Sequence, residues 1–322
     1  MLLLLALASL AALAAGRYLI PVSEAAGALF PSLFGEASLT VRNVILNIRL
    51  PRVLLALLAG AGLGCAGGAF QALFSNPLAT PDTLGVATGA SFGAVLGILF
   101  GLPSPAIQLC ALAAGLAAAA LVIFVSRVRG SSPVLMMILA GMVVSALFAA
   151  LVSLVKYVAD PQDVLPAITF WLMGSLSGAT KKTLAMGAPM ICVGLAVLWL
   201  YRWKLNAMSL SEEEALSLGV NVRRVRLCVI SGAAMITASV VSMCGLIGWV
   251  GLLIPHAARM LFGSDNRSVI PASMLMGAFF MLMIDTVARS ATASEIPASI
   301  LTAVLGAPFF IFLLRKTGGV RS

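Results

Sequence analysis

Residues 52–74 read RVLLALLAGAGLGCAGGAFQALF, a run of 23 residues in which only the first is charged. A helix needs about 20 apolar residues to cross the roughly 30 Å hydrocarbon core of a bilayer, because each residue adds about 1.5 Å. The stretch is long and apolar enough to do so. A closed β-barrel is excluded, because its strands alternate apolar and polar residues. The run predicts an all-α integral membrane protein.

Similar apolar runs fill most of the chain. Together with the quoted stretch they lie at about residues 1–16, 52–74, 83–101, 104–126, 133–156, 183–201, 226–245, 247–262, 269–288 and 296–314. Short polar or Pro/Gly connections separate them, which predicts a single transmembrane domain, 1–322, of about ten helices. The first run also has the length of a signal peptide, but it lacks a charged start, which favours a first span.

The composition agrees with a protein that needs lipid as solvent. Hydrophobic residues make up 61% of the chain and charged residues 10%. The net charge of +9 comes from single or paired basic residues at the ends of apolar runs, a pattern typical of orientation in a membrane and not of nucleic-acid binding. Five cysteines lie inside apolar runs without metal-ligand spacing, so neither disulfides nor a metal site is predicted.

Side chains that could carry chemistry are few. No G-x-x-x-x-G-K-[ST] motif is present, so a partner has to supply any ATP hydrolysis, and the chain is not expected to be an enzyme. The single histidine, His256, has no second ligand at metal-binding spacing. Asp285 is the one acid inside an apolar run, and Arg289 follows four residues later on the same helix face. We expect this pair to neutralise itself, which disfavours an ion-coupled carrier.

The longest polar stretch, residues 206–226, reads NAMSLSEEEALSLGVNVRRVR. Ser211 followed by three glutamates is typical of a helix start, and Gly219 is a plausible helix stop. The stretch therefore predicts two short helices joined at Gly219, which would form a docking surface beside the membrane. In the orientation favoured by the basic residues, with twelve Lys and Arg inside and eight outside, this surface is cytoplasmic.

Several motifs carry a family resemblance. The stretch RLPR at 49–52 precedes the glycine-rich run, and QALFSNPLATPDTLG follows at 71–85; GWVGLLIPH lies at 248–256. Shorter matches are LAG at 139–141, WLMG at 171–174, SLGV at 217–220, EIP at 295–297 and GAPF at 306–309. Over nearly its whole length the chain resembles the FecCD family, the permease subunits of type II ABC importers for siderophores, haem and cobalamin.

The resemblance implies a BtuC-like permease fold in which helices two to five and seven to ten form an inverted repeat. It also implies the partners of such a subunit. These are two cytoplasmic ATP-binding subunits, a periplasmic or lipid-anchored substrate-binding protein, a second permease subunit, and the lipid bilayer of a prokaryotic plasma (inner) membrane. A homodimer is the simpler expectation, and a paralogous partner stays open. No cofactor and no nucleic acid are implied.

The resemblance also assigns candidate site residues. Arginines matching Arg49, Arg52 and Arg289 dock the binding protein in the family, and simple snorkelling of these side chains stays open as an alternative. Asn76 and Leu78 match a cytoplasmic gate, whose second position falls at Val134 and Leu135, where this chain is apolar. The ATPase-coupling residues are Ser211, Glu212, Glu213, Glu214, Ala215, Leu218, Gly219 and Val220, within coupling helices at about 206–224.

The expected function is a permease that forms the translocation pathway for a metal chelate by alternating access driven by partner ATPases. The sequence does not choose among an iron-siderophore, haem, cobalamin and an oxyanion such as molybdate. An ion-coupled secondary transporter is the alternative.

Overall fold

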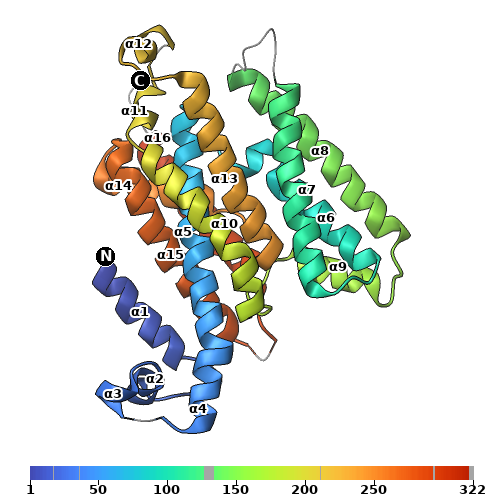
Figure 1. The fold of residues 1–322 in the computed structure, drawn as a ribbon, viewed down its shortest axis with the longest axis vertical. Helices are drawn as coiled ribbons and strands as arrows, with labels where there is room; N and C mark the ends of the chain where they lie inside the picture. The colour runs from blue at the N-terminus through green and yellow to red at the C-terminus, as the bar shows by residue number, and fades with distance from the viewer. Residues whose placement is uncertain (17, 36, 127–133, 211, 293, 319–322) are drawn as a thin grey trace.

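The computed structural model describes all residues except 17, 36, 127–133, 211, 293 and 319–322, and the described chain is built from helices. Figure 1 shows their arrangement. In chain order they are α1 Leu2–Ala14, α2 Val22–Leu29, α3 Pro31–Phe34, α4 Leu39–Asn43, η1 Val44–Arg49, α5 Leu50–Leu73, η2 Pro81–Leu84, α6 Val86–Leu99, α7 Ser104–Val125, α8 Val134–Val158, α9 Val164–Leu172, α10 Lys181–Tyr201, α11 Lys204–Ala207, α12 Glu212–Ser217, α13 Val222–Cys244, α14 Val250–Phe262, α15 Asn266–Ser290 and α16 Ala298–Gly318.

Six of the described helices are long and apolar enough to cross a membrane, and four shorter helices are also apolar. The long ones are Leu39–Leu73, Ser104–Val125, Val134–Val158, Lys181–Tyr201, Val222–Cys244 and Asn266–Ser290; the shorter ones are Leu2–Ala14, Val86–Leu99, Val250–Phe262 and Ala298–Phe312. Each of the ten predicted runs falls on one of them. The prediction of an all-helical membrane protein is confirmed, while the number of ten crossings stays a prediction.

Helix α5 forms the centre of the larger helix group, and α10, α13, α14 and α15 pack around it (Figure 1). Helices α6 to α9 form a second group, joined to the first where α13 packs against α6 and α7. In the most apolar window of each helix, 78% of the residues are buried in α5 and α13 but only 22% in α8 and α10. Lipid or a partner therefore has to cover much of α8 and α10.

Small residues let α5 approach its neighbours closely. A Cβ added to Gly60 would lie 2.1 Å from the carbonyl oxygen of Gly277 on α15, and one added to Gly64 would lie 2.4 Å from that of Ser273. On α6, a Cβ added to Gly93 would lie 2.2 Å from the carbonyl oxygen of Cys110 on α7. Close backbone approach is how helices pack where lipid removes the usual hydrophobic drive.

The helix that contains the quoted stretch begins earlier than the apolar run. It extends continuously from Leu39 to Leu73 over 35 residues. Its π-helical part, Val44–Arg49, comes just before Pro51. A proline has no backbone N–H to donate, and its ring crowds the carbonyl four residues earlier, so a wider turn accommodates it there. Sequence patterns placed the helix start at residue 52, because they followed hydrophobicity alone.

Candidate functional site

The three arginines predicted to dock a binding protein converge at one end of the bundle, where α1 ends near α5 and α15. Arg49 is 6% exposed, Arg52 9% and Arg289 7%. Each guanidinium group has an acceptor within the chain. A buried charge without a partner is costly, so their burial depends on these contacts. The structure therefore gives the arginines an intramolecular role, and their docking role stays a prediction.

Two of the arginines bind the end of α1. Nη1 of Arg49 donates to the carbonyl oxygens of Leu13 at 2.6 Å and Ala14 at 2.9 Å. Nη2 of Arg289 donates to the carbonyl of Ala12. The last carbonyls of a helix lack partners within it and carry its partial negative charge, so a cation there is favourable. Arg49 and Arg289 thus attach α1 to the rest of the bundle.

Arg52 is the centre of the ionic contacts at this end. Its Nε lies 2.8 Å from Oδ1 of Asp285, and its Nη1 lies 2.8 Å from Oε1 of Glu295 in the connection after α15. The predicted pair of Asp285 with Arg289 is longer, 3.7 Å. Arg52 is therefore the closer partner of Asp285, and it stands 233 residues away in the chain. The side chain of Asp285 is 1% exposed and that of Glu295 is 33% exposed.

The predicted coupling residues lie at the opposite end, on and around α12. Glu212, Glu213 and Glu214 occupy its first turn, and Gly219 ends it with a φ of +74°. The N–H of Val220 donates to the Ala215 carbonyl at 3.0 Å, which closes the helix end. The predicted start and stop are confirmed except at Ser211, which lies outside the described residues.

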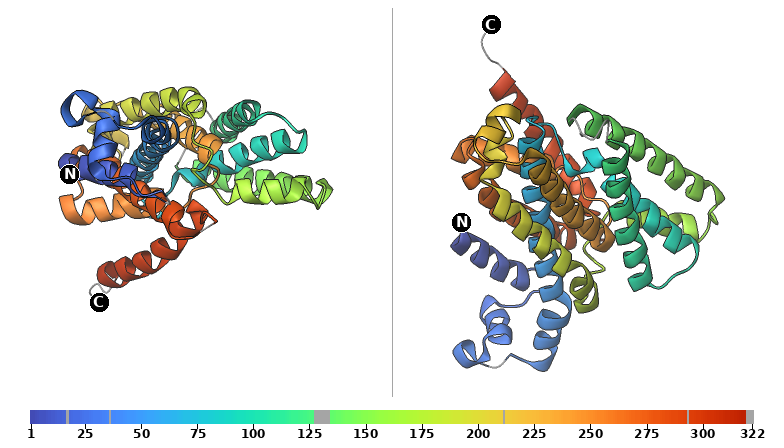
Figure 2. Two further views of the ribbon diagram at one scale, coloured as in Figure 1. Left: turned by 90° about the horizontal axis from the view of Figure 1, so that it is seen from below. Right: turned by 45° about the horizontal axis from the view of Figure 1, so that its top comes forward.

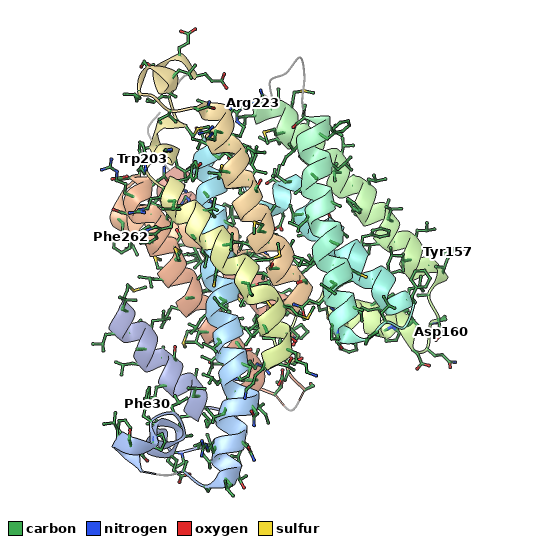
Figure 3. The ribbon with its side chains drawn as sticks, in the orientation of Figure 1. Phe30, Tyr157, Asp160, Trp203, Arg223 and Phe262 are labelled. Carbon is green, nitrogen blue, oxygen red and sulfur yellow. The ribbon has the colours of Figure 1, made fainter. Side chains whose placement is uncertain are left out.

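One part of that prediction is wrong. After Gly219 the chain does not form a second short helix, because α13 begins at Val222 and continues to Cys244. The other short helix of this end is α11, before α12. Sequence patterns missed this because the arginines at 223, 224 and 226 look like a polar segment although they form the first turns of a long helix. In Figure 3, Arg223 and Trp203 lie beside α12, far from Phe30 at the other end.

The surface of α12 is suited to a protein partner. Ala215 and Val220 are buried at 1% and 3%, whereas Leu216 is 60% exposed and Leu218 64% exposed. The three glutamates beside them are also exposed. Exposed leucines with adjacent charges are typical of a binding surface with a hydrophobic centre and a polar rim.

The predicted gate residues Asn76 and Leu78 lie in the turn between α5 and η2. Ser75 has a φ of +48°, and the Asn76 side chain accepts a hydrogen bond from the backbone N–H of Leu78 at 2.9 Å. Leu78 is 56% exposed. Asparagine stabilises such a turn by bonding the backbone two residues on. The NPL motif therefore forms a hydrogen-bonded turn in which the Leu78 side chain is exposed.

The second gate position lies at the start of α8. Val134 is half-buried and Leu135 is 66% exposed, and the preceding residues 127–133 lie outside the described part. The segment η2 packs on α8 further along, where a Cβ on Gly141 would meet the Thr83 carbonyl at 2.0 Å. The two predicted gate positions therefore adjoin η2 and α8, the two segments that pack against each other.

A pocket of about 320 Å³ lies between the predicted gate turn, residues 75–78, and the coupling segment, which is α11 with its following turn, and most of the residues that line it are polar. The residues that line it come from α5, the gate turn, α11 and its following turn, and the ends of α14 and α15: Gln71, Ala72, Ser75, Asn76, Pro77, Leu205, Asn206, Ser209, Arg259, Ser264 and Asn266. Arg259 donates to the side chain of Gln71 there. Sequence analysis did not single out these polar contacts, because they join residues far apart in the chain.

Asn206 connects the coupling segment to α15. Its amide nitrogen donates to Oδ1 of Asp265 at 2.7 Å, and its amide oxygen accepts from the side chain of Asn266 at 2.8 Å. The backbone N–H of Asn266 also donates to that oxygen at 2.9 Å. Asn266 is 7% exposed, so its two bonds to Asn206 are partly buried, whereas the bond from Asn206 to Asp265 is exposed. Asn206 thus joins α11 to the residues that begin α15.

The described residues contain no group of three or more His, Cys, Asp and Glu that could hold a metal ion. His256 packs edge-on against Phe310, with ring centroids 6.3 Å apart. Nothing in this arrangement provides a nucleophile with a base.

Comparison with known proteins agrees with this geometry. The model of the FecCD transport family matches residues 3–316. The molybdate import system permease protein of Haemophilus influenzae is 42% identical over 98% of this chain and 94% of its own length. The hemin transport system permease protein of Yersinia pestis is 37% identical over 87% of this chain and 85% of its own.

Solved structures give the same result for the fold. A metal-chelate type ABC transporter in an inward-facing conformation superposes with a TM-score of 0.89, at 39% identity, over 98% of this chain and 97% of that chain. The PsaBC complex of Streptococcus pneumoniae superposes with a TM-score of 0.60 at 20% identity, over 83% of this chain and 91% of that chain.

Proposed function

Because the chain belongs to the FecCD transport family, we propose that two copies of it enclose the pathway through which an importer takes up a metal chelate. The chain is a multi-pass membrane protein and the non-catalytic permease subunit of an ABC importer. ATPase and binding-protein partners follow from that function. Ten crossings, with the four shorter apolar helices completing the six long ones, are part of the proposal.

The contact between Asn206 and the start of α15 is the observation that carries the mechanism. One ATP-binding subunit docks on the exposed face of α12 in each copy, and closure of the two ATP-binding subunits displaces the coupling segment. Asn206 passes this displacement to α15 through the 2.7 and 2.8 Å hydrogen bonds. The gate turn with Leu78 shares a pocket with the same residues. The gate at Leu78 and at the start of α8 then opens and closes as the helices move as rigid bodies.

The second permease subunit covers the apolar faces of α8 and α16. Leu135, Leu139, Met142, Val143, Leu147 and Leu154 on α8 are between 45% and 67% exposed. Helix α16 exposes Val304, Leu305, Phe309 and Phe312, and few contacts hold it to its own chain. Figure 2 shows α16 on the opposite side of the bundle from α10. In a two-fold homodimer both subunits contribute this same side to the interface, and the proposed pathway lies between them.

The binding protein docks at the arginine end. Glu295 is the accessible acid there, because a third of its side chain is exposed. We place the docking contact at Arg52, where a glutamate of the binding protein exchanges with Glu295. Asp285 stays bound to Arg52, because it is fully enclosed.

The cargo is proposed at the level of a class. Relatives named for molybdate, iron chelatin, cobalamin and hemin transport are between 42% and 37% identical to this chain. Because identities this close do not separate the four cargoes, the binding protein has to provide the selection.

Reconstitution tests the proposal. The chain is co-expressed with its ATPase and binding protein, inserted into liposomes, and assayed for ATP hydrolysis. We expect Glu213→Arg to remove most of the hydrolysis, because it reverses charge on α12. Glu24→Arg reverses another exposed acid, on α2, and is the matched control when hydrolysis is measured without binding protein. Uptake driven by an ion gradient without ATPase would contradict the proposal.

A further inference from the structure

An apolar groove lies between α1, α5, α10 and α15, on the side of the bundle where α10 is exposed. Its volume is about 830 Å³, within the range of small-molecule binding sites. Leu54, Leu57 and Leu58 line one wall, and small side chains of α10 such as Ala185 and Ala188 form the hollow opposite. Apart from Lys181 and Cys192, every lining residue is apolar.

The length of the groove matches one leaflet of a bilayer. Its lining on α10 runs from Lys181 to Cys192, which is eleven residues along the helix. At about 1.5 Å per residue this is roughly 16 Å, and half of a hydrocarbon core of about 30 Å is roughly 15 Å. The groove thus extends from the membrane surface to about the bilayer centre.

A positive charge lies at the surface end. Lys181 is exposed, and its Nζ donates to Oδ1 of Asn47 at 2.7 Å, which fixes the ammonium group at the rim. An ammonium group has three donors, so two remain for another ligand. Lys181 is also the first residue of α10, where the helix dipole disfavours a cation. An anion at the rim relieves that repulsion.

We propose that this groove binds an anionic phospholipid, with one acyl chain in the groove and the phosphate beside Lys181. The charge at the rim, the apolar wall and the one-leaflet length together fit a lipid and not a soluble anion. The site lies away from α8 and α16, so the lipid stays bound at the outer surface of the assembled transporter.

Native mass spectrometry tests the proposal on the purified permease. The protein is incubated with phosphatidylglycerol or phosphatidylcholine that carry the same acyl chains, and the retained lipids are counted. We expect about fivefold more phosphatidylglycerol than phosphatidylcholine, the effect of about one basic residue at a membrane surface. Glycerol 3-phosphate, which has the phosphate without acyl chains, is expected not to bind. Binding of glycerol 3-phosphate equal to that of phosphatidylglycerol would overturn the proposal.

Variants locate the site. Ala185→Trp fills the groove and is expected to remove the retained lipid, while Ala196→Trp, on an exposed part of α10 outside the groove, keeps it. Lys181→Gln is expected to abolish the headgroup preference, and Lys182→Gln, the exposed neighbour that does not line the groove, to preserve it. Ala188→Phe is a second filling variant in case Ala185→Trp does not fold. Wild-type lipid retention in a folded filling variant would refute the site.

Discussion

The two ends of the molecule both carry charged side chains, but these differ in burial. At the arginine end, Arg49, Arg52 and Arg289 are 6 to 9% exposed and bind acceptors of their own chain. At the coupling end, the side chain of Glu212 is 71% exposed although it pairs with Arg226 at 3.2 Å. The buried charges of the arginine end hold helices together, whereas the exposed charges of the coupling end remain available to a partner.

The largest effect is expected from Asp285→Ala, because it leaves Arg52 and Arg289 buried with less compensation. Breaking a buried ion pair costs about 3–5 kcal/mol of stability. Thermal unfolding of the detergent-solubilised permease measures the loss. Asp160→Ala, which removes an exposed acid, is the control. If both variants unfold at the same temperature, the arginine end does not depend on its buried acid.

A smaller loss is expected from Asn206→Ala, because it removes the partner of the buried Asn266. Leaving a buried polar group unpaired costs about 1–3 kcal/mol. The variant is also expected to lower ATP-driven uptake more than ATP hydrolysis, since the ATPase still docks on α12. Ser268→Ala, at an exposed position in the first turn of α15 that does not line the pocket, is the control. Unchanged uptake per ATP hydrolysed would show that the contact carries no motion.

Glu295→Gln tests the partly exposed member of the arginine end. An ion pair with an exposed partner contributes about 0–1 kcal/mol, so stability should fall by no more than that. Under the docking proposal, the same variant binds the substrate-binding protein more tightly, because Arg52 no longer has a charged partner to exchange. Surface plasmon resonance on the reconstituted permease measures this. Weaker binding would place the docking contact elsewhere.

Leu218→Ser examines the coupling end without affecting the fold. The side chain is 64% exposed, so stability should change by about 0.5 kcal/mol or less. ATPase docking should weaken, because this exposed leucine belongs to the proposed docking surface. Co-purification of the ATPase with the variant and with wild type measures it. If the variant were destabilised but still bound the ATPase, Leu218 would support the fold and not the docking surface.

The smallest effect concerns pH. Hydrogen bonds from the backbone N–H of Arg267 and the amide of Asn206 hold the pKa of Asp265 below its ordinary value. The ionised form is therefore favoured by folding, and its contribution is present above the unfolded pKa of about 4 and lost as pH falls through the lower folded value. We expect Asp265→Asn to flatten the acid limb of the stability profile measured by thermal unfolding.

The sequence predicted most of the helices because they depend on local hydrophobicity. The stretch at 52–74 and the stop at Gly219 follow from the residues themselves. The partners of the arginines did not follow. Arg52 and Asp285 are 233 residues apart, and the acceptors of Arg49 are backbone carbonyls of α1. No pattern marks a contact of this kind. The contacts of Asn206 with Asp265 and Asn266 were missed for the same reason.

Helix α15 is held by other parts of the chain at both ends and near its middle. Asn206 holds it at Asn266, the ionic contacts hold it near Arg289, and Gly277 presses it against Gly60 of α5. Gly277 lies eleven residues from Asn266 and twelve from Arg289, about 17 Å from each end. In the proposed function, a displacement of Asn206 would tilt α15 about its close contact with α5. A tilt of roughly 10° would move each end by about 3 Å, in opposite directions.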